Sequence, residues 1–204
     1  MDQRTDDWFA ARLGKVTASR IADVVAKTKS GPSASRANYM AQLIVERMTG
    51  KPTESYSNSA MQWGTDTEPL ARAAYEMATG YMVDEVGFVE HESLPMCGAS
   101  PDGLVNDKGL IEIKCPNTAT HIETLINGTI DNKYMLQMQW QMACTDRDWC
   151  DFVSFDPRMP EPLQLKIILV PKNEMLIVDL ENQVEQFLNE VQEKVEFLNN
   201  LKVL

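Results

Sequence analysis

Long hydrophobic runs and an export signal are both missing from this sequence. Its most apolar stretch, Leu165 to Val170, has the length of one strand, whereas a membrane-spanning helix needs about 20 apolar residues. The first residues, MDQRTDDWF, are charged and lack the apolar segment of a secretory signal. We therefore expect a protein that does not enter a membrane and that is located in the cytoplasm.

Cysteine and histidine are scarce and poorly spaced for metal binding. The 4 cysteines form no CxxC pair, and the 2 histidines, His91 and His121, have no Cys or His at ligand spacing. These absences argue against a zinc site and against a disulfide framework, so we expect reduced thiols. We expect surface or capping roles for both histidines and a core-filling role for Cys115.

Internal repeats and low-complexity linkers are also absent. The chain has 204 residues, of which 44% are hydrophobic and 24% are charged. This is the composition of an ordinary globular domain. We predict one domain that spans residues 1–204.

Positive charge is in short supply overall but not near the N-terminus. The net charge is -11, yet residues 1–51 hold nine Lys and Arg against five Asp and Glu, and residues 52–204 hold ten against twenty-five. A locally basic segment on an acidic body can still bind phosphate groups, because the local field matters more than the total charge. Chance would explain the asymmetry equally well, so charge alone does not identify a partner.

The hydrophobic periodicity changes from helical in the first part of the chain to strand-like in the middle. Helical spacing, capping residues and glycine stops predict helices at residues 17–27, 35–49, 58–79, 118–126, 134–143 and 181–201. In the third of these, Pro69 predicts a break or a new first turn. Alternating patterns predict strands at 81–90, 109–115, 151–155 and 163–170, with a hairpin over 104–114. This order predicts an α/β domain around a mixed sheet.

Three charged residues stand close together around the predicted hairpin. Asp102 lies in a Pro-Asp-Gly turn, and Glu112 and Lys114 occupy alternate positions of the second strand, so both project from one face. Two carboxylates in one site repel each other, and a divalent cation relieves that repulsion. Without His or Cys ligands, oxygen donors suit Mg²⁺ or Mn²⁺ rather than Zn²⁺. We expect the backbone carbonyl of Ile113 to be a third donor.

A lysine beside metal-bound water has a chemical use. It can orient or deprotonate the water and neutralise the charge that develops on phosphorus, so the combination predicts metal-assisted phosphodiester hydrolysis. The alternative is an exposed hairpin with a surface ion pair between Glu112 and Lys114, which would contribute little. The apolar residues around them in the segment 110–115 argue against it, because they indicate a strand buried on both faces.

The chain resembles the PD-(D/E)xK nucleases and, over most of its length, the phage lambda exonuclease and YqaJ-type viral recombinase family. The resemblance extends from Asp6 to the C-terminal helix and rests on DDWFAARLGKVTAS at 6–19, KSG at 29–31, the WG…E…A pattern at 63–71, SPDGL at 100–104, IEIKCP at 111–116, YMLQMQ at 134–139 and FDPRM at 155–159. It implies a restriction-endonuclease-like core, with a central mixed β-sheet flanked by helices. It also implies an N-terminal helical segment and a long C-terminal helix.

The resemblance implies a catalytic role for five residues. Asp102 and Glu112 would bind the metal ion, and Lys114 would be the catalytic lysine. Glu68 is similar to an additional acidic residue of the family that helps to bind metal or water. Gln137 is similar to a glutamine that closes the site, unless it is simply one of three glutamines on a helix.

The resemblance also implies contacts with DNA. Arg12, Ser19 and Ser100 would form a pocket for the 5′-phosphate of the DNA end. Alternatively, Arg12 pairs on the surface with an aspartate of the same N-terminal segment. Lys29 and Met61 would be a basic DNA contact and an apolar wedge, at positions where the family has arginine and leucine. Lysine keeps the charge without the bidentate fork, and methionine keeps apolar bulk with more flexibility.

The function that the resemblance implies is a Mg²⁺-dependent 5′-to-3′ exonuclease that acts on double-stranded DNA ends and leaves a 3′ single strand. The family relationship further implies phage or prophage origin, the cytoplasm of a bacterial host, a ring-shaped homotrimer and cooperation with a single-strand annealing protein. A restriction- or repair-type endonuclease on the same core is the alternative enzyme, but no inserted recognition domain is visible. A DNA-binding scaffold with a vestigial site is a third interpretation.

Overall fold

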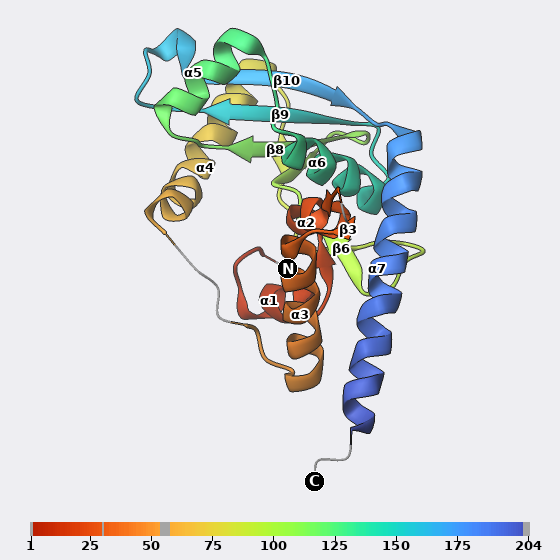
Figure 1. Cartoon of the computed structure of the whole chain (residues 1–204). Coiled ribbons are helices and arrows are strands. Elements are labelled where there is room, and N and C mark those ends of the chain that lie inside the picture. Colours follow the sequence, from red (N-terminus) through yellow and green to blue (C-terminus); the bar gives the residue numbers. More distant parts are fainter. Residues whose placement is uncertain (1, 30, 54–57, 202–204) are drawn as a thin grey trace.

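The computed structural model describes residues 2–29, 31–53 and 58–201 of the chain (Figure 1). Its centre is a five-stranded sheet with the strand order β10-β9-β8-β7-β4. In this sheet β8 and β9 pair in parallel, and the other neighbours are antiparallel, so the predicted mixed sheet is confirmed. The strands are β4 (Val83–Asp84), β7 (Gly103–Val105), β8 (Gly109–Lys114), β9 (Trp149–Phe155) and β10 (Leu165–Pro171).

The predicted hairpin forms from β7 and β8. Asn106 in its turn has a φ of 49°, a left-handed conformation that asparagine tolerates. Gly109 begins β8 beside Trp149 of β9, and a Cβ atom at Gly109 would lie 2.2 Å from the Trp149 ring. Glycine at this position therefore leaves the space in which the Trp149 ring packs against β8.

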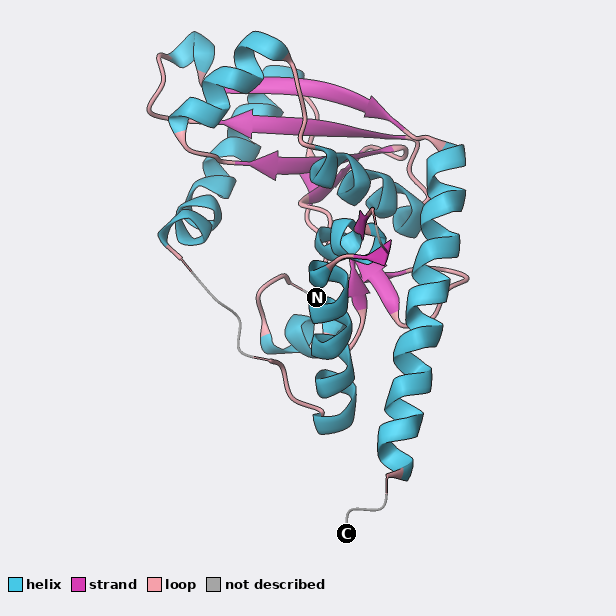
Figure 2. Ribbon diagram, viewed as in Figure 1, coloured by secondary structure: helices cyan, strands magenta, loops and turns pink. Residues whose placement is uncertain are grey.

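Helices cover both faces of the sheet (Figure 2). These helices are α4 (Ser59–Thr79), α5 (Thr118–Asn127) and α6 (Asn132–Thr145). Ala71 and Tyr75 of α4 pack against one face, and Met138 and Met142 of α6 pack against the other. Because side chains alternate along a strand, the odd-numbered residues of β8 and β9 face α4 and the even-numbered ones face α6. The glutamate and lysine of β8 therefore project toward α6.

The N-terminal and C-terminal helices form a second layer beside the sheet. The N-terminal part contains α1 (Asp6–Arg12), η1 (Ala18–Arg20), α2 (Ile21–Val25), the paired strands β2 (Lys27–Thr28) and β3 (Gly31–Pro32), and α3 (Ala34–Thr49). A small sheet of order β1-β6-β5 belongs to the same layer. It joins β1 (Val16–Thr17) of the N-terminal part with β5 (Val89–Glu90) and β6 (Cys97–Ala99) from the middle of the chain. The short η2 (Glu161–Leu163) precedes β10.

The long helix α7 (Glu174–Asn200) runs past α2 and α3 (Figure 1). Its Val184 and Phe187 share a core with Leu43 of α3, and Arg36 of α3 forms a bidentate ion pair with its Glu190. Within the described residues, no helix combines the length and the apolar character that a membrane crossing requires.

Two predicted elements are divided in the structure. Residues 17–27 form the end of β1, then η1 and α2, rather than one helix, because Thr17 pairs with Gly98 of β6. The predicted strand at 81–90 is two short strands, β4 and β5, which belong to different sheets. The alternation along this segment therefore records a crossing from one sheet to the other.

Two helix boundaries also differ from the prediction. Pro69 does not break α4, which continues through it. The helix is held in place by its buried residues Thr67, Ala71 and Tyr75. The closing helix begins earlier than expected, because the side chain of Asn173 accepts a hydrogen bond from the backbone N–H of Leu176 and so caps α7.

Both histidines are buried, so the prediction of surface positions is wrong. His121 Nε2 lies 2.8 Å from the carbonyl oxygen of Leu163, and its Nδ1 lies 2.8 Å from the Ser154 hydroxyl. His91 stacks on Trp140, and its Nδ1 accepts from the backbone N–H groups of residues 93 and 94. The capping role is therefore correct for His91, and His121 ties α5 to β9.

All four cysteines are free and buried. Burial raises the pKa of the Cys115 thiol to about 12, so this thiol is protonated at neutral pH. Cys115 also packs in the apolar cluster under α4. Its predicted core-filling role is confirmed.

Candidate active site

Asp102 is fixed at the start of the hairpin by the neighbouring strand. It directly precedes β7, and its Oδ2 accepts a hydrogen bond of 2.6 Å from the backbone N–H of Ile113 on β8. This bond turns the carboxylate across the hairpin toward β8. The structure therefore brings Asp102 to the strand that carries Glu112 and Lys114.

Glu112 is almost completely buried, with 1% of its surface exposed. Its Oε1 lies 2.5 Å from Lys114 Nζ and accepts from Gln137 Nε2 at 2.7 Å. Its Oε2 accepts from Gln141 Nε2 at 2.6 Å. The predicted neighbours Lys114 and Gln137 thus contact Glu112 directly, and together the three donors fix the orientation of its carboxylate.

Gln141 is a site residue that sequence reasoning missed. It lies one helical turn after Gln137 on α6, so both amides reach the same carboxylate. Its side chain is fully buried. The signal was the spacing of four residues, which became informative only once the face of α6 that meets β8 was known.

The charges of the site act on one another. Burial raises the pKa of Asp102, and the nearby Glu112 charge raises it further. Burial lowers the pKa of Lys114, but Glu112 and Asp102 outweigh that effect and the pKa of Lys114 lies above its usual range. Lys114 is therefore a protonated ammonium group, positioned 4.8 Å above the Tyr134 ring.

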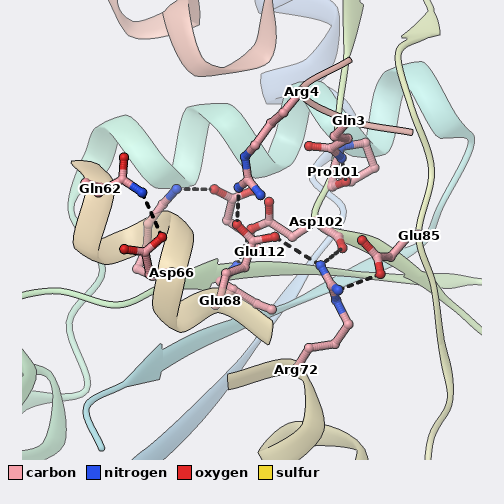
Figure 3. Close-up of polar contacts among 12 residues, drawn as sticks. Gln3, Arg4, Gln62, Asp66, Glu68, Arg72, Glu85, Pro101, Asp102 and Glu112 are labelled. Carbon is pink, nitrogen blue, oxygen red and sulfur yellow. Dashed lines mark hydrogen bonds and ion pairs between the residues drawn. The ribbon is translucent and has the colours of Figure 1, made fainter. Parts of the chain in front are cut away.

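Glu68 approaches the same site from α4. Its Oε1 lies 3.0 Å from Arg72 Nη2, and its Oε2 lies 2.5 Å from Arg4 Nη2 (Figure 3). Arg72 also pairs with Glu85 at 2.7 Å and donates to the Asp102 carbonyl at 3.5 Å. The two arginines were not identified from the sequence, since no spacing connects Arg4 with α4.

An open cleft of about 1310 Å³ gives access to these groups. Among the residues that line it are Arg4, Met61, Trp63, Glu68, Asp102, Ile113, Lys114, Tyr134 and Arg158. The Arg158 guanidinium lies 4.5 Å above the Trp63 ring and is bound to Asp156 at 2.7 Å. This contact connects the start of α4 with the end of β9 and so defines one wall of the cleft.

The oxygen donors of the cleft suit a hard divalent cation. Glu112 is buried and Asp102 is half-buried, and the charge on Glu112 raises the pKa of Asp102. Ile113 follows Glu112 on β8, and it lines the cleft. Within the described residues, no group of three or more His, Cys, Asp or Glu side chains could hold a metal ion. The donor set is therefore two carboxylates and a carbonyl, which fits Mg²⁺ or Mn²⁺ with water completing the coordination.

Arg12 and Ser100 also meet in the structure. Arg12 Nη1 donates to the Ser100 hydroxyl at 3.1 Å, and Trp8 Nε1 donates to the same oxygen at 3.0 Å. The guanidinium lies 4.0 Å above the Trp8 ring, and burial lowers the pKa of Arg12 to about 10. Within the described residues, Arg12 forms no ion pair with Asp6 or Asp7, so the alternative surface pairing is absent.

The other residues predicted to contact DNA have no contact with Arg12 or Ser100 among the described residues. Ser19 lies in η1, and its hydroxyl is 3.4 Å from Thr17 Oγ1. Met61 is in the first turn of α4 and lines the cleft with 56% of its surface exposed. Lys29 is exposed at the turn between β2 and β3 and does not line the cleft. Ser30 of the KSG motif lies outside the described residues.

The fold and the site can be compared with solved structures of similar proteins. The structure is similar to the crystal structure of an alkaline exonuclease, LHK-Exo, from Laribacter hongkongensis, with 53% sequence identity, a TM-score of 0.89 and 96% of each chain covered. A structure of LHK-Exo in complex with dAMP gives 55% identity and a TM-score of 0.89, over 95% of this chain and 96% of that chain. A phage-related exonuclease from Haemophilus somnus 129PT shares 16% identity and a TM-score of 0.71, over 90% of this chain and 96% of that chain.

The sequence is also similar to a viral protein and to a protein family. The uncharacterized protein R354 of Acanthamoeba polyphaga mimivirus is 24% identical over 168 residues, which are 74% of this chain and only 29% of that protein. Residues 7–148 match the YqaJ-like viral recombinase domain. The fold is restriction-endonuclease-like, as expected, and the chain belongs to the YqaJ-like viral recombinase family.

Proposed function

We propose that the protein is a metal-dependent exonuclease that degrades double-stranded DNA from its 5′ ends and releases 5′-mononucleotides. The observation that carries this proposal is the cluster of Asp102, Glu112, Lys114 and Gln137, of which Asp102 and Lys114 line one open cleft. The relative LHK-Exo is an alkaline exonuclease and has been crystallised with dAMP, which is a nucleoside monophosphate. Both points favour hydrolysis of a phosphodiester over nucleic-acid binding alone.

Asp102, Glu112 and the carbonyl of Ile113 would hold Mg²⁺, or Mn²⁺ in its place. Bound there, the ion supplies positive charge to the phosphodiester and lowers the pKa of a coordinated water. Gln137 and Gln141 keep the Glu112 carboxylate in one orientation, because each donates to a different oxygen. Glu68 would add an acceptor for the attacking water from the α4 side.

Lys114 acts on the charge that develops during cleavage. It lies against the Glu112 carboxylate and would act there as a cation. An ammonium group at this position stabilises the negative charge that grows on the phosphate oxygens, and it can orient the attacking water through its remaining N–H groups. It can also donate a proton to the leaving oxygen.

The proposed polarity depends on Arg12 and Ser100. Ser100 stands two residues before Asp102 in the chain and holds Arg12 at 3.1 Å, although neither Arg12 nor Ser100 lines the cleft itself. Among the described residues, Arg12 has no carboxylate partner, and a half-buried guanidinium of this kind attracts an anion such as the 5′-phosphate of a DNA end. Ser19 would add a hydroxyl donor. Each cleavage creates a new 5′-phosphate, which would then occupy the same pocket.

Further features of the proposal concern larger assemblies. The basic segment 1–51, with Lys29 as a backbone contact and Met61 as a wedge at the duplex end, would face DNA inside a homotrimeric ring. The 3′ single strand would pass to an annealing protein of the same phage or prophage, in the cytoplasm of a bacterial host. Sedimentation of the protein at micromolar concentration tests the ring, because a persistent monomer would exclude it.

One experiment distinguishes the candidate functions. Linear and covalently closed circular duplexes are incubated with the protein and Mg²⁺, and the linear duplex carries a label at its 5′ or its 3′ end. We expect degradation of only the linear form, with early release of the 5′ label as a mononucleotide. Cleavage of the circle would identify an endonuclease, and no cleavage of either form would identify a binding scaffold.

A further inference from the structure

The first residues of the chain are fastened to the loop that carries the candidate site. Gln3 Nε2 donates to the carbonyl oxygens of Val86 and Pro101, each at 2.8 Å. Figure 3 shows Gln3 beside Pro101. Pro101 directly precedes Asp102. The position of the N-terminal segment and that of the Asp102 carboxylate are therefore set by the same piece of backbone.

Arg4 is directed into the cleft from this anchored segment. Its φ of 66° is left-handed, a conformation with an energetic cost for a residue other than glycine. The guanidinium contacts Glu68 through Nη2, and its side chain remains 46% exposed while that of Glu68 is 14% exposed. Within the described residues, this is the one ion pair of Arg4, so most of its five N–H donors are available to the cleft.

Arg4 and Arg72 hold Glu68 in different ways. Arg72 is 13% exposed, does not line the cleft, and is also bound to Glu85. Arg4 lines the cleft and has a free face. Glu68 would therefore keep one arginine partner if Arg4 turned to another anion.

We propose that Arg4 is a phosphate-binding residue of the cleft, which exchanges Glu68 for a backbone phosphate when a DNA strand enters. The inference rests on the proposed function, since it requires that a strand occupies this cleft. The exchange would couple two events. A cation held by Asp102 and Glu112 would compete with Arg4 for the nearby Glu68 charge, and a phosphate that binds Arg4 would free the Glu68 carboxylate to face the cation and its water.

The coupling predicts opposite effects of one substitution. In Arg4→Gln, the loss of a positive charge beside Glu68 should raise the affinity for Mn²⁺ by about threefold to tenfold. The same substitution should weaken duplex binding by about threefold to tenfold, and the slope of log affinity against log salt concentration should fall by about one contact. A residue with only a scaffolding role would weaken both.

The experiment measures Mn²⁺ binding calorimetrically without nucleic acid, and binding of a 5′-phosphorylated blunt duplex in EDTA at several salt concentrations. Arg4→Lys should restore most of the salt slope because it keeps the charge. Arg147→Gln is the matched control, since Arg147 is bound to the Asn106 carbonyl outside the cleft. It should change neither affinity.

Two results would overturn the inference. One is a parallel loss of Mn²⁺ and duplex affinity in Arg4→Gln with an unchanged thermal midpoint, and the other is a duplex affinity and salt slope equal to those of the wild type. If Arg4→Gln is poorly folded, Arg4→Lys provides the test. A salt slope in Arg4→Lys that is lower than that of the wild type by one contact would contradict the proposal that the positive charge of residue 4 binds a phosphate. A wild-type protein that binds no duplex would remove the proposed function as well, so the two failures are distinguishable.

Discussion

Glu112 and Asp151 are buried carboxylates on neighbouring strands, but they lie on opposite faces of the sheet. Glu112 on β8 faces α6, where Lys114 and two glutamine amides bind it. Asp151 on β9 faces α4 and accepts one hydrogen bond of 2.7 Å, from the Tyr75 hydroxyl.

The difference shows that burial alone does not make a carboxylate reactive. Burial raises the pKa of Asp151, and α4 closes over it with the core residues Ala71 and Tyr75. On the other face, Lys114 beside Glu112 lines the open cleft. A cation, fixed amide donors and access to solvent therefore distinguish the candidate catalytic face from the structural one.

The largest expected effect is that of removing the ammonium group of Lys114 from the candidate catalytic face. Lys114→Ala should reduce the cleavage rate by at least about 100-fold, because the developing phosphate charge loses its nearest ammonium group. Duplex binding in EDTA should change little. Single-turnover cleavage of linear duplex in Mg²⁺ measures the rate.

Lys108→Ala provides the control for this prediction. Lys108 lies in the turn of the same hairpin, is 72% exposed and pairs with Asp148 on the surface, so its loss should leave the rate unchanged. Retention of more than about a tenth of the wild-type rate in Lys114→Ala would show that the lysine makes no typical electrostatic contribution.

The second prediction separates two buried glutamines of α6. Gln141→Ala removes a donor from Glu112 and should lower the rate about tenfold and the free energy of unfolding by about 1–3 kcal/mol. Gln139 instead donates to the Pro171 carbonyl and accepts from the Asn173 N–H. Gln139→Ala should therefore cost similar stability in urea unfolding without a comparable loss of rate. Equal rates in the two variants would mean that Gln141 has no positioning role.

The third prediction concerns Arg12, a half-buried cation that has no carboxylate partner in the described part of the chain. Wild-type protein should digest 5′-phosphorylated duplex faster than 5′-hydroxyl duplex. Arg12→Ala should slow digestion of the phosphorylated duplex, because charged hydrogen bonds worth about 1.5–3 kcal/mol are lost. It should also remove most of the preference for the phosphorylated end. The 5′-hydroxyl duplex is the internal control in each variant. A preference that survives in Arg12→Ala would place the phosphate elsewhere.

Much of the fold was predictable from the sequence, and the reasons are local. The hairpin of β7 and β8 follows from turn residues and alternation, and α3, α4 and α6 follow from helical spacing with glycine or aspartate in the left-handed position after each. The segment 81–90 was misread because two sheets share its alternating pattern. Local periodicity does not reveal which partner strand a residue meets.

The site was predictable only in part for a related physical reason. Asp102, Glu112 and Lys114 lie within thirteen residues of one another, so the hairpin alone brings them together. Gln141 and Arg4 reach the site through tertiary packing, Gln141 from α6 and Arg4 from a segment 64 residues away from Glu68. Such contacts depend on how elements dock and leave no spacing in the sequence.

The smallest expected effect compares Asp151 with Asp156, a third buried carboxylate, which follows β9. For Asp156, burial would raise the pKa, but hydrogen bonds from Arg158 and Thr118 outweigh it and lower the pKa to about 2. A lowered pKa contributes stability that is present above the ordinary value of 3.8 and is lost as the pH falls toward 2. The raised pKa of Asp151 has the opposite sign, since it opposes folding at neutral pH and relaxes on acidification.

Asp156→Asn should therefore lower the free energy of unfolding by about 1–2 kcal/mol at pH 7, with the difference shrinking below pH 4. Asp151→Asn should leave stability unchanged or raise it at pH 7, because asparagine can still accept from Tyr75 without a buried charge. Urea unfolding at several pH values between about 3 and 8 measures both. Destabilisation of the same size in both variants at pH 7 would show that Asp151 is held as tightly in its charged form as Asp156, and the distinction between the two faces of the sheet would then depend on Lys114 and the glutamines alone.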